Sequence, residues 1–94
     1  MLYVNVTYTM PKANREDFLA EIKNQIIMEF TRLEQGNIAY EFSVPVDRGD
    51  QVYLREIWEE SAFENHKNSE NIKKLGKLKE KYNISTNITI SRFD

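Results

Sequence analysis

The sequence contains no cysteine, and this absence excludes disulfide bridges, thiolate metal ligands and a cysteine nucleophile together. Small proteins of oxidising compartments often depend on disulfides, so a cysteine-free chain of 94 residues favours the cytoplasm. A single histidine is present, whereas a non-haem iron triad needs two, and the carboxylates show no zinc-type spacing. We therefore expect no bound metal.

Long apolar runs, glycine-rich loops and a basic excess are missing as well. No run approaches the ~20 apolar residues that a membrane-spanning helix needs, and Met1–Val6 lacks the basic start of a signal peptide. The three glycines form no phosphate-binding loop, so a nucleotide cofactor has no visible binding site. The net charge of −2 argues against nucleic acid as a partner. These absences predict a cytoplasmic protein that binds neither membranes nor nucleic acid and uses no organic cofactor.

What is present is the composition of an ordinary folded domain. Hydrophobic residues make up 40% of the chain, and 3 glycines and 2 prolines interrupt it rarely. A length of 94 residues suits one hydrophobic core, so we expect a single domain over residues 1–94.

Four segments alternate apolar and polar residues with a period of two, which is typical of β-strands with one buried face. Pro45–Asp50 has the composition of a hairpin loop, so the second and third strands should pair antiparallel. The predicted strands are residues 2–10, 37–44, 51–58 and 84–91.

Apolar residues at spacings of four and three predict one long helix between the first two strands. Asn14 is suited to the N-cap of this helix, and Gly36 is expected to end it. Five residues should form its single buried stripe, namely Phe18, Ile22, Ile26, Phe30 and Leu33.

A second helical region lies between the third and fourth strands. Ser61 and Glu64 form a predicted capping box, so a short helix should begin there and carry His66. A further helix is expected after a break near Asn68. Its residues should include Ser69, Ile72, Leu75, Leu78 and Tyr82.

The order β-α-β-β-α-β predicts an α+β fold of the ferredoxin-like class, in which helices cover one face of a four-stranded antiparallel sheet. Large side chains such as Tyr3 and Ile57 should then lie on the other face. An uncovered sheet with such residues would be an exposed apolar patch, so we expect a homodimer.

The unusual residues of the chain gather between residues 55 and 69, where its only tryptophan and its only histidine lie. Glu56 and Trp58 share one face of the third strand because they are two residues apart. His66 follows in a helix that must fold back over the sheet, so a carboxylate, an indole and an imidazole could meet. A neutral imidazole titrates near physiological pH and could take a proton from a phenol or an enol.

Each of these residues also has a purely structural interpretation. Trp58 could be a core anchor, Glu56 could pair with a neighbouring basic residue, and His66 could be a partly buried hydrogen-bonding group. Asn5 is a further candidate, on the face of the first strand opposite Val4. That face could be either the cleft or the core of a dimer.

Four short patterns carry a resemblance to a known family. The patterns are Gly36-Asn37-x-x-Tyr40, Glu56-x-Trp58, Ala62-Phe63-x-x-His66 and Ser69 before the last helix. In their order and spacing they resemble the antibiotic biosynthesis monooxygenase family, whose members are small dimeric ferredoxin-like proteins. This family includes quinol and anthrone monooxygenases, autoinducer-processing isomerases and haem-degrading enzymes.

The resemblance implies a dimeric α/β barrel with a pocket between helices and sheet in each subunit. It implies a cofactor-independent monooxygenase that oxidises a small aromatic quinol, an anthrone or a related enolisable substrate with O2. His66 would bind or deprotonate the substrate hydroxyl, Trp58 would stack on its ring, and Asn5 would hold the developing oxyanion. The remaining substrate-binding residues would be Glu56, Tyr40 and Phe63.

The resemblance also separates branches of the family. Haem degradation is disfavoured, because residues 72–78 contain Gly76 and lysines but no histidine where haem-degrading members place their ligand. Two other functions stay open. One is an isomerase of a small carbonyl metabolite that uses His66 to move a proton, and the other is a non-catalytic dimeric ligand-binding or stress protein.

Overall fold

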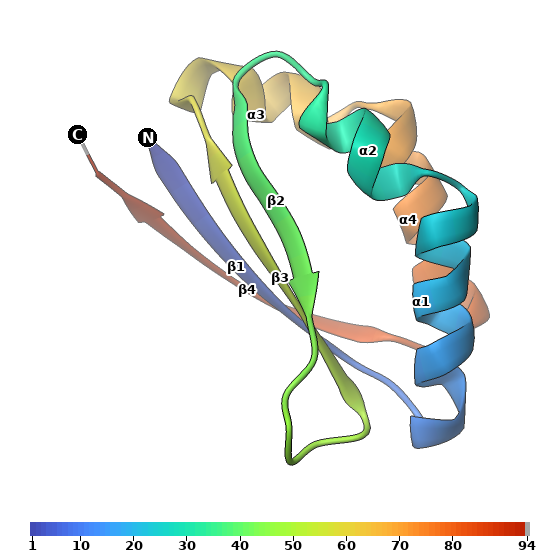
Figure 1. Cartoon of the computed structure of the whole chain (residues 1–94). Coiled ribbons are helices and arrows are strands. Elements are labelled where there is room, and N and C mark those ends of the chain that lie inside the picture. Colours follow the sequence, from blue (N-terminus) through green and yellow to red (C-terminus); the bar gives the residue numbers. More distant parts are fainter. Residues whose placement is uncertain (94) are drawn as a thin grey trace.

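The computed structural model describes residues 1–93, which form a four-stranded antiparallel sheet with helices against one of its faces (Figure 1). The element order confirms the predicted ferredoxin-like arrangement, with paired helices in each of the two helical positions. The elements are β1 (Leu2–Thr9), the 3₁₀ helix η1 (Lys12–Asn14), α1 (Arg15–Asn24), α2 (Ile27–Arg32), β2 (Asn37–Ser43), β3 (Gln51–Trp58), α3 (Glu60–Lys67), α4 (Glu70–Lys81) and β4 (Ser85–Arg92).

The strand order in the sheet is β2-β3-β1-β4, so β1 and β3 are central and β2 and β4 are edges. β2 and β3 pair antiparallel through the predicted hairpin, and β1 pairs with both β3 and β4. Both chain ends lie at the same end of the sheet (Figure 1). Because alternate residues of a strand share a face, this register decides which side chains meet the helices.

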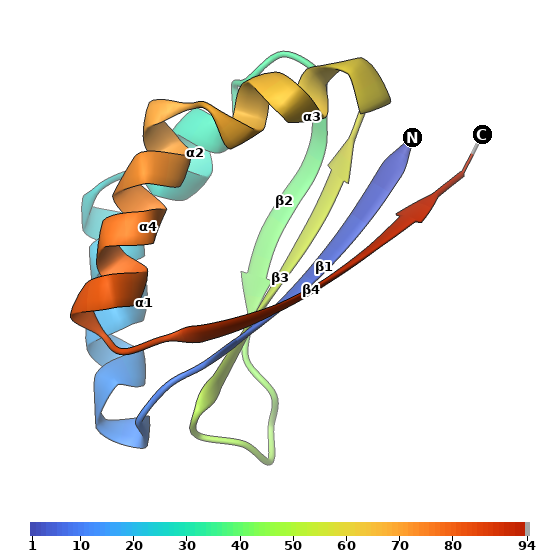
Figure 2. The ribbon, with the colours of Figure 1, turned by 180° about the vertical axis from the view of Figure 1, so that it is seen from behind.

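The helix-facing side of the sheet forms the hydrophobic core, as the alternation predicts. Every second residue of β1 from Leu2 to Tyr8 is buried there. Figure 2 shows the helices on this one face of the sheet. Ile88 and Ile90 of β4 share the face through their pairing with β1, yet they remain 55% and 49% exposed. The helices therefore leave the β4 edge open.

The prediction of one long helix between β1 and β2 is wrong, because the structure has two helices there, α1 and α2. Ile26, between them, adopts a left-handed conformation with φ 58°, which an α-helix cannot continue through. The interruption shifts the buried face by one residue, so Ile27 and Thr31 are buried. Ile26, Phe30 and the following Leu33 are exposed instead.

Two predicted helix caps also differ from the structure. Asn14 occupies the N-cap position of α1, but its side chain makes no capping bond and donates to the carbonyl of Tyr82 at 2.9 Å. This bond joins the start of α1 to the end of α4. The capping box at Ser61 is wrong, because α3 already begins at Glu60 with Glu59 as its N-cap.

The second helical region otherwise agrees with the prediction. α3 ends at Lys67, and Ser69 begins α4 as an N-cap whose hydroxyl accepts a hydrogen bond from the Ile72 N–H at 3.3 Å. The break near Asn68 is therefore confirmed. Within residues 1–93, no helix has the length and the apolar character that crossing a membrane requires.

β2 contains one irregularity that affects the site. Asn37 pairs with Trp58 and Ala39 with Ile57, so Ile38 is an extra residue in the strand. Ile38 is exposed at this bulge. Beyond it, Tyr40 is buried in register with Glu56, which places a phenol beside the carboxyl group of the neighbouring strand.

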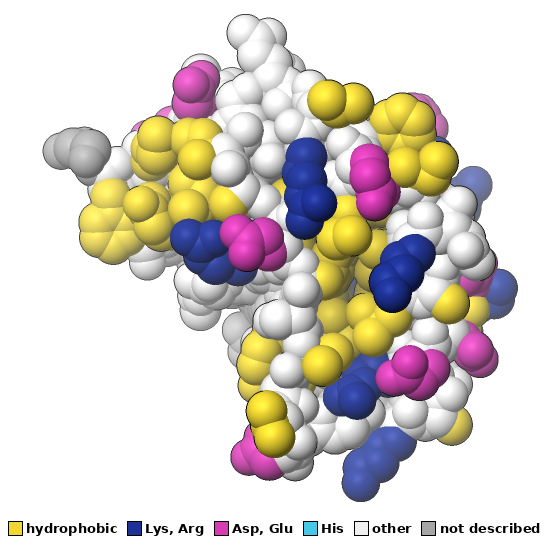
Figure 3. All heavy atoms as spheres, in the orientation of Figure 1, with side chains coloured by type: hydrophobic (Ala, Val, Ile, Leu, Met, Phe, Trp, Pro, Cys, Tyr) yellow, Lys and Arg dark blue, Asp and Glu magenta, His cyan; other side chains and the backbone are white. Residues whose placement is uncertain are grey.

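The face of the sheet away from the helices is polar along its centre, where the Arg55 guanidinium pairs with Glu41 at 2.9 Å. Apolar side chains gather at the end of the sheet beside the chain termini (Figure 3). There the rings of Tyr3 and Phe93 meet edge to face at 4.8 Å. Tyr53 is also exposed on this face, toward its other end, so apolar side chains lie on both sides of the polar centre.

Candidate functional site

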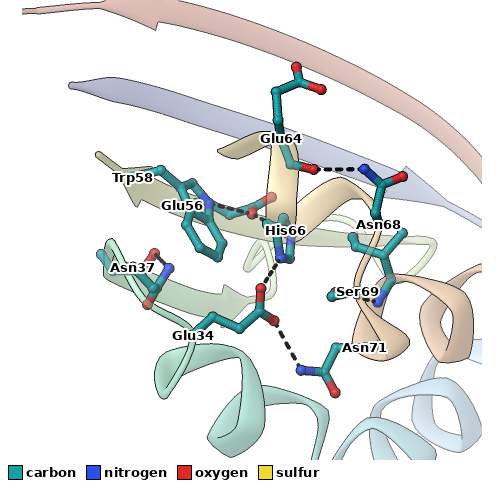
Figure 4. A network of polar contacts seen from close by, with 11 residues as sticks. Glu34, Asn37, Glu56, Trp58, Glu64, His66, Asn68, Ser69 and Asn71 are labelled. Atoms are coloured by element: carbon teal, nitrogen blue, oxygen red, sulfur yellow. Dashed lines mark hydrogen bonds and ion pairs between the residues drawn. The ribbon is translucent and has the colours of Figure 1, made fainter. Parts of the chain in front are cut away.

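The candidate site begins with residues at the carboxyl end of β3 and in the helix that follows. Glu56 and Trp58 both leave β3 toward the helices, because one residue separates them. The Trp58 indole N–H donates to Glu56 Oε1 at 2.9 Å, which satisfies a buried polar group. α3 folds back over the strand and lays the His66 ring on the indole, with ring centres 4.2 Å apart (Figure 4). The structure therefore brings these three residues together.

His66 lies between two carboxyl groups. Glu34 Oε1 is 2.9 Å from His66 Nδ1, and Glu56 Oε1 is 3.5 Å from His66 Nε2. The other oxygen of Glu34 accepts a hydrogen bond from the Asn71 amide at 3.0 Å (Figure 4). Since an ionised carboxylate can only accept, the short contact assigns the proton of a neutral ring to Nδ1 and leaves Nε2 as a base. In the described part of the chain, no cluster of three or more His, Cys, Asp or Glu side chains is arranged to hold a metal ion.

Glu34 lies in the loop between α2 and β2, and sequence reasoning missed it. The loop is fixed beside the start of α3 by the Gly36 carbonyl, which accepts from the Glu59 N–H at 2.8 Å. Gly36 has φ +83°, and a Cβ atom added there would overlap the Cβ of Ala62. The glycine therefore permits the close approach that brings Glu34 to the histidine. Gly36 signals a turn in the sequence, but nothing in the pattern indicates where a loop carboxylate points.

Glu56 is a buried carboxyl group, with 6% of its surface exposed. Burial raises the pKa of Glu56 above its ordinary value of 4.5, while the Trp58 hydrogen bond and the His66 charge act in the opposite direction. The charge of Glu34 adds to the rise. Glu56 therefore keeps its proton to a higher pH than an exposed carboxyl group, and in that form it can donate a hydrogen bond.

Replacing Glu56 with glutamine is expected to remove one source of pH-dependent stability. A carboxyl group with a raised folded-state pKa stabilises the fold while protonated, and this contribution is lost as the pH rises through that pKa. Glutamine keeps an acceptor for Trp58 and does not ionise. Urea unfolding between about pH 4 and about pH 8 should show the Glu56→Gln variant gaining stability relative to the native protein as the pH rises. If the difference in the free energy of unfolding between the two proteins stayed constant over this pH range, the raised pKa of Glu56 would be contradicted.

Two tyrosines, Tyr8 and Tyr40, are held in the neutral form. Burial is the main cause that raises the pKa of Tyr8 and of Tyr40 above the ordinary value of 10.0, and the Glu56 charge adds to it. Both phenols therefore keep their protons at neutral pH. They can donate hydrogen bonds to a ligand and do not serve as bases.

A cavity of about 370 Å³ lies between the helix-facing side of the sheet and the helices α3 and α4. Its lining is predominantly apolar, and the polar groups of Glu56 and His66 lie together in it. A cavity of this size and character suits a small aromatic compound held by a few polar contacts.

The predicted site residues divide into three groups in the structure. Trp58 is fully buried behind His66, where it supports the imidazole ring instead of lining the cavity. Asn5 is not brought to the site, because it lies on the exposed face of β1 away from the helices. The predicted residues that line the cavity are Glu56, His66, Tyr40 and Phe63.

Comparison with protein families finds a match over most of the chain. The sequence model of the antibiotic biosynthesis monooxygenase family matches residues 1–77, a range that includes Glu34, Glu56, Trp58, His66 and Asn71. The chain belongs to this family. Family membership thus agrees with the resemblance that the short sequence patterns carry.

Solved structures of antibiotic biosynthesis monooxygenases and similar proteins share this fold. A putative antibiotic biosynthesis monooxygenase from Deinococcus radiodurans has a TM-score of 0.80 at 18% identity, covering 100% of this chain and 93% of that one. A Pseudomonas aeruginosa protein has a TM-score of 0.83 at 21% identity, covering 99% and 94%. SnoaB from Streptomyces nogalater, described as a cofactor-independent oxygenase, has a TM-score of 0.74 at 10% identity, covering 98% and 91%. No curated protein sequence matches this member of the family.

Proposed function

We propose that this protein is a cofactor-independent monooxygenase that oxidises a small aromatic quinol, an anthrone or a related enolisable compound with O2. The observation that carries the proposal is a buried base, His66, oriented by Glu34 at a cavity of about 370 Å³. Family membership and the likeness in fold to SnoaB support the same chemistry. In this chemistry the substrate itself reduces oxygen, so the protein must bind it, remove a proton and exclude water.

Each polar group of the cluster has a distinct task in this proposal. His66 Nε2 takes the substrate proton, because Glu34 holds the ring proton on Nδ1 and stabilises the imidazolium that forms. Glu56, in its protonated form, donates a hydrogen bond to the oxyanion of the substrate. Trp58 is a positioning residue, since it contacts both groups and does not line the cavity.

The reaction of an anthrone needs no external reductant. His66 removes a C–H proton, and the resulting carbanion passes one electron to O2. The two radicals combine into a C–O bond, and the peroxide takes a proton back from His66. Loss of the second C–H proton and cleavage of the O–O bond leave one oxygen atom as the new quinone carbonyl and release the other as water.

Oxygen consumption by the purified protein with a panel of hydroquinones, naphthoquinols and anthrones tests the proposal. We expect at least one compound to consume O2 well above a protein-free blank and to gain one oxygen atom from isotopically labelled O2. Turnover under nitrogen to a product of unchanged mass would assign an isomerase instead. Saturable binding without turnover under air or nitrogen would assign a non-catalytic ligand-binding protein.

We also propose that two copies of the chain pair through the sheet face away from the helices. The exposed rings of Tyr3 and Phe93 at one end of that face support this, because apolar patches of this kind mark protein contacts. Light scattering at micromolar concentration should give twice the chain mass of 11.2 kDa. A Tyr3→Asp variant should shift the protein toward the monomer. A monomeric native protein under these conditions would contradict the dimer.

A further inference from the structure

The cavity extends well beyond the catalytic cluster. Val4 and Tyr8 of β1 both line it, and the four-residue step from one to the other spans about 13 Å of strand. Val4 pairs with Glu56 of β3, whereas Tyr8 pairs with Thr86 of β4. A ligand with a single ring at His66 would therefore leave the Tyr8 end empty.

A positive charge lies at this second end. Lys79 lines the cavity, and its Nζ is 5.9 Å from the centre of the Tyr8 ring. Lys79 forms no ion pair with a carboxylate of residues 1–93. Lys67, which lines the cavity near His66, already pairs with Glu64 at 3.1 Å. The charge of Lys79 is therefore the more available of the two to a ligand.

A hydroxyl group accompanies this charge. The Oγ1 atom of Thr86 is buried in the cavity lining and has no hydrogen-bond partner within residues 1–93. Rotation about its Cα–Cβ bond exchanges the hydroxyl and methyl positions, so the hydroxyl can turn to the cavity. An ammonium and a hydroxyl can both donate hydrogen bonds, and together they favour an anionic acceptor.

Gly76 supplies space between the two ends of the cavity. It lies in the interior of α4, one turn before Lys79, and lines the cavity. Glycine in a helix interior is destabilising relative to alanine. A Cβ atom at this position would meet nothing within 4 Å, so the packing of the fold does not require a glycine. The open space beside Gly76 is therefore available to a ligand.

We propose that the cavity binds an extended aromatic acid whose reacting hydroxyl lies at His66 and Glu56 and whose carboxylate binds to Lys79 and Thr86. The rings pass over Gly76. This inference rests on the proposed role of the cavity as the substrate site. It narrows the substrate class from aromatic quinols in general to quinols that carry an acidic group far from the reacting ring.

Isothermal titration calorimetry with two stable probes tests the charge preference. The probes are 6-hydroxy-2-naphthoate, with its hydroxyl and carboxylate at opposite ends, and the neutral 6-hydroxy-2-naphthamide. The native protein is expected to bind the acid at least about tenfold more tightly than the amide, as one available ion pair allows. Equal affinities for the two probes would overturn the proposal.

Lysine variants then locate the anion. Lys79→Met should lower the affinity for the acid about tenfold and leave the amide unchanged, which removes the preference. Lys77→Met is the matched control, because Lys77 is exposed on the far side of the same helix and its loss changes the net charge equally. If Lys77→Met lowered the affinity for the acid equally, the effect would reflect only the net charge of the protein. The assignment of the carboxylate to Lys79 would then be overturned. Thr86→Val should lower the affinity for the acid but not for the amide, and by a smaller factor than Lys79→Met does.

Variants at Gly76 test the space between the two ends. Gly76→Ala should raise the melting temperature by about 4 °C, because alanine favours the helix and nothing obstructs its methyl group. Gly76→Leu should remain folded and bind both probes at least about tenfold more weakly, since its side chain occupies the ligand space. Unchanged binding by Gly76→Leu would overturn the proposed path of the ligand.

These titrations do not depend on turnover. If the protein prefers the acid through Lys79 but consumes no oxygen with any quinol, the proposed ligand class is supported and the proposed oxygenase activity is contradicted. If the protein oxidises quinols without preferring the acid, the proposed activity is supported and the proposed ligand class is contradicted.

Discussion

His66→Ala is expected to lower the rate of oxygen consumption with an accepted quinol by about 100-fold or more, the usual contribution of a positioned general base. The imidazole lines the cavity, with Nδ1 held by Glu34 at 2.9 Å and Nε2 left as the base, 3.5 Å from Glu56 Oε1. In the proposed mechanism no other side chain of the cavity lining duplicates it, because Tyr40 stays protonated and Glu56 acts as a protonated hydrogen-bond donor. The remaining activity would come from binding and from desolvation of the substrate.

The variant needs controls for folding, because removing His66 takes away the partner of Glu34 Oε1 in a partly buried position. His66→Gln keeps a hydrogen-bonding side chain and should be as inactive as the alanine variant while retaining native circular dichroism. Asn65→Ala changes an exposed neighbour on the same helix and should have native activity. Full activity in a folded His66→Gln variant would show that the histidine is not the base.

Glu34 is expected to act through His66. Glu34→Gln should therefore lower kcat and leave KM nearly unchanged, because it removes the charge that stabilises the imidazolium and does not alter the cavity lining. A change confined to KM would mean that Glu34 contributes to binding or to loop structure only.

Gly36→Ala is expected to destabilise the protein by about 3 kcal/mol. Two costs combine at this position. Alanine is strained at φ +83°, and its Cβ would overlap the Cβ of Ala62 at the start of α3. Urea unfolding should show the loss directly, and the melting temperature should fall by roughly 15 °C.

A second substitution separates the two costs. Ala62→Gly removes the overlapping atom, so the double variant should be about 2 kcal/mol more stable than the sum of the single effects predicts. Gly49→Ala is the control, because a Cβ there would make only ordinary contacts with Lys12, at 3.7 Å and beyond. Its effect should stay within about 0.5 kcal/mol. Strict additivity of the Gly36 and Ala62 variants would show that the two residues do not collide.

The strands could be predicted from the sequence because each has one face against the helices and one away from them. The period of two is therefore visible. The predicted ends of β3 agree with the structure, and β2 begins at the predicted residue and ends one residue earlier than predicted. The division between α1 and α2 could not be predicted. Ile26 and Ile27 are adjacent, so two apolar stripes fit the same segment, one through Phe30 and the other through Ile27. A β-branched residue in the left-handed region is rare, and the sequence around Ile26 does not indicate this conformation.

The sequence could predict only those site residues whose positions follow from local chain geometry. Glu56 and Trp58 share a face because of strand pleating, and His66 follows them closely in the chain. Glu34 is 32 residues from His66, and their contact depends on how a loop crosses α3. Asn5 could be placed opposite Val4, but the sequence did not indicate which of the two faces the helices would cover.

The indole of Trp58 has a practical consequence. It is the chain's only tryptophan, it stacks on the imidazole of His66, and it donates a hydrogen bond to Glu56. Its fluorescence therefore arises from one chromophore whose surroundings change when either of these neighbours gains or loses a proton. The protein carries an intrinsic optical reporter at its proposed proton-transfer centre, and the protonation state of that centre can be followed in unlabelled protein, in real time and without a substrate.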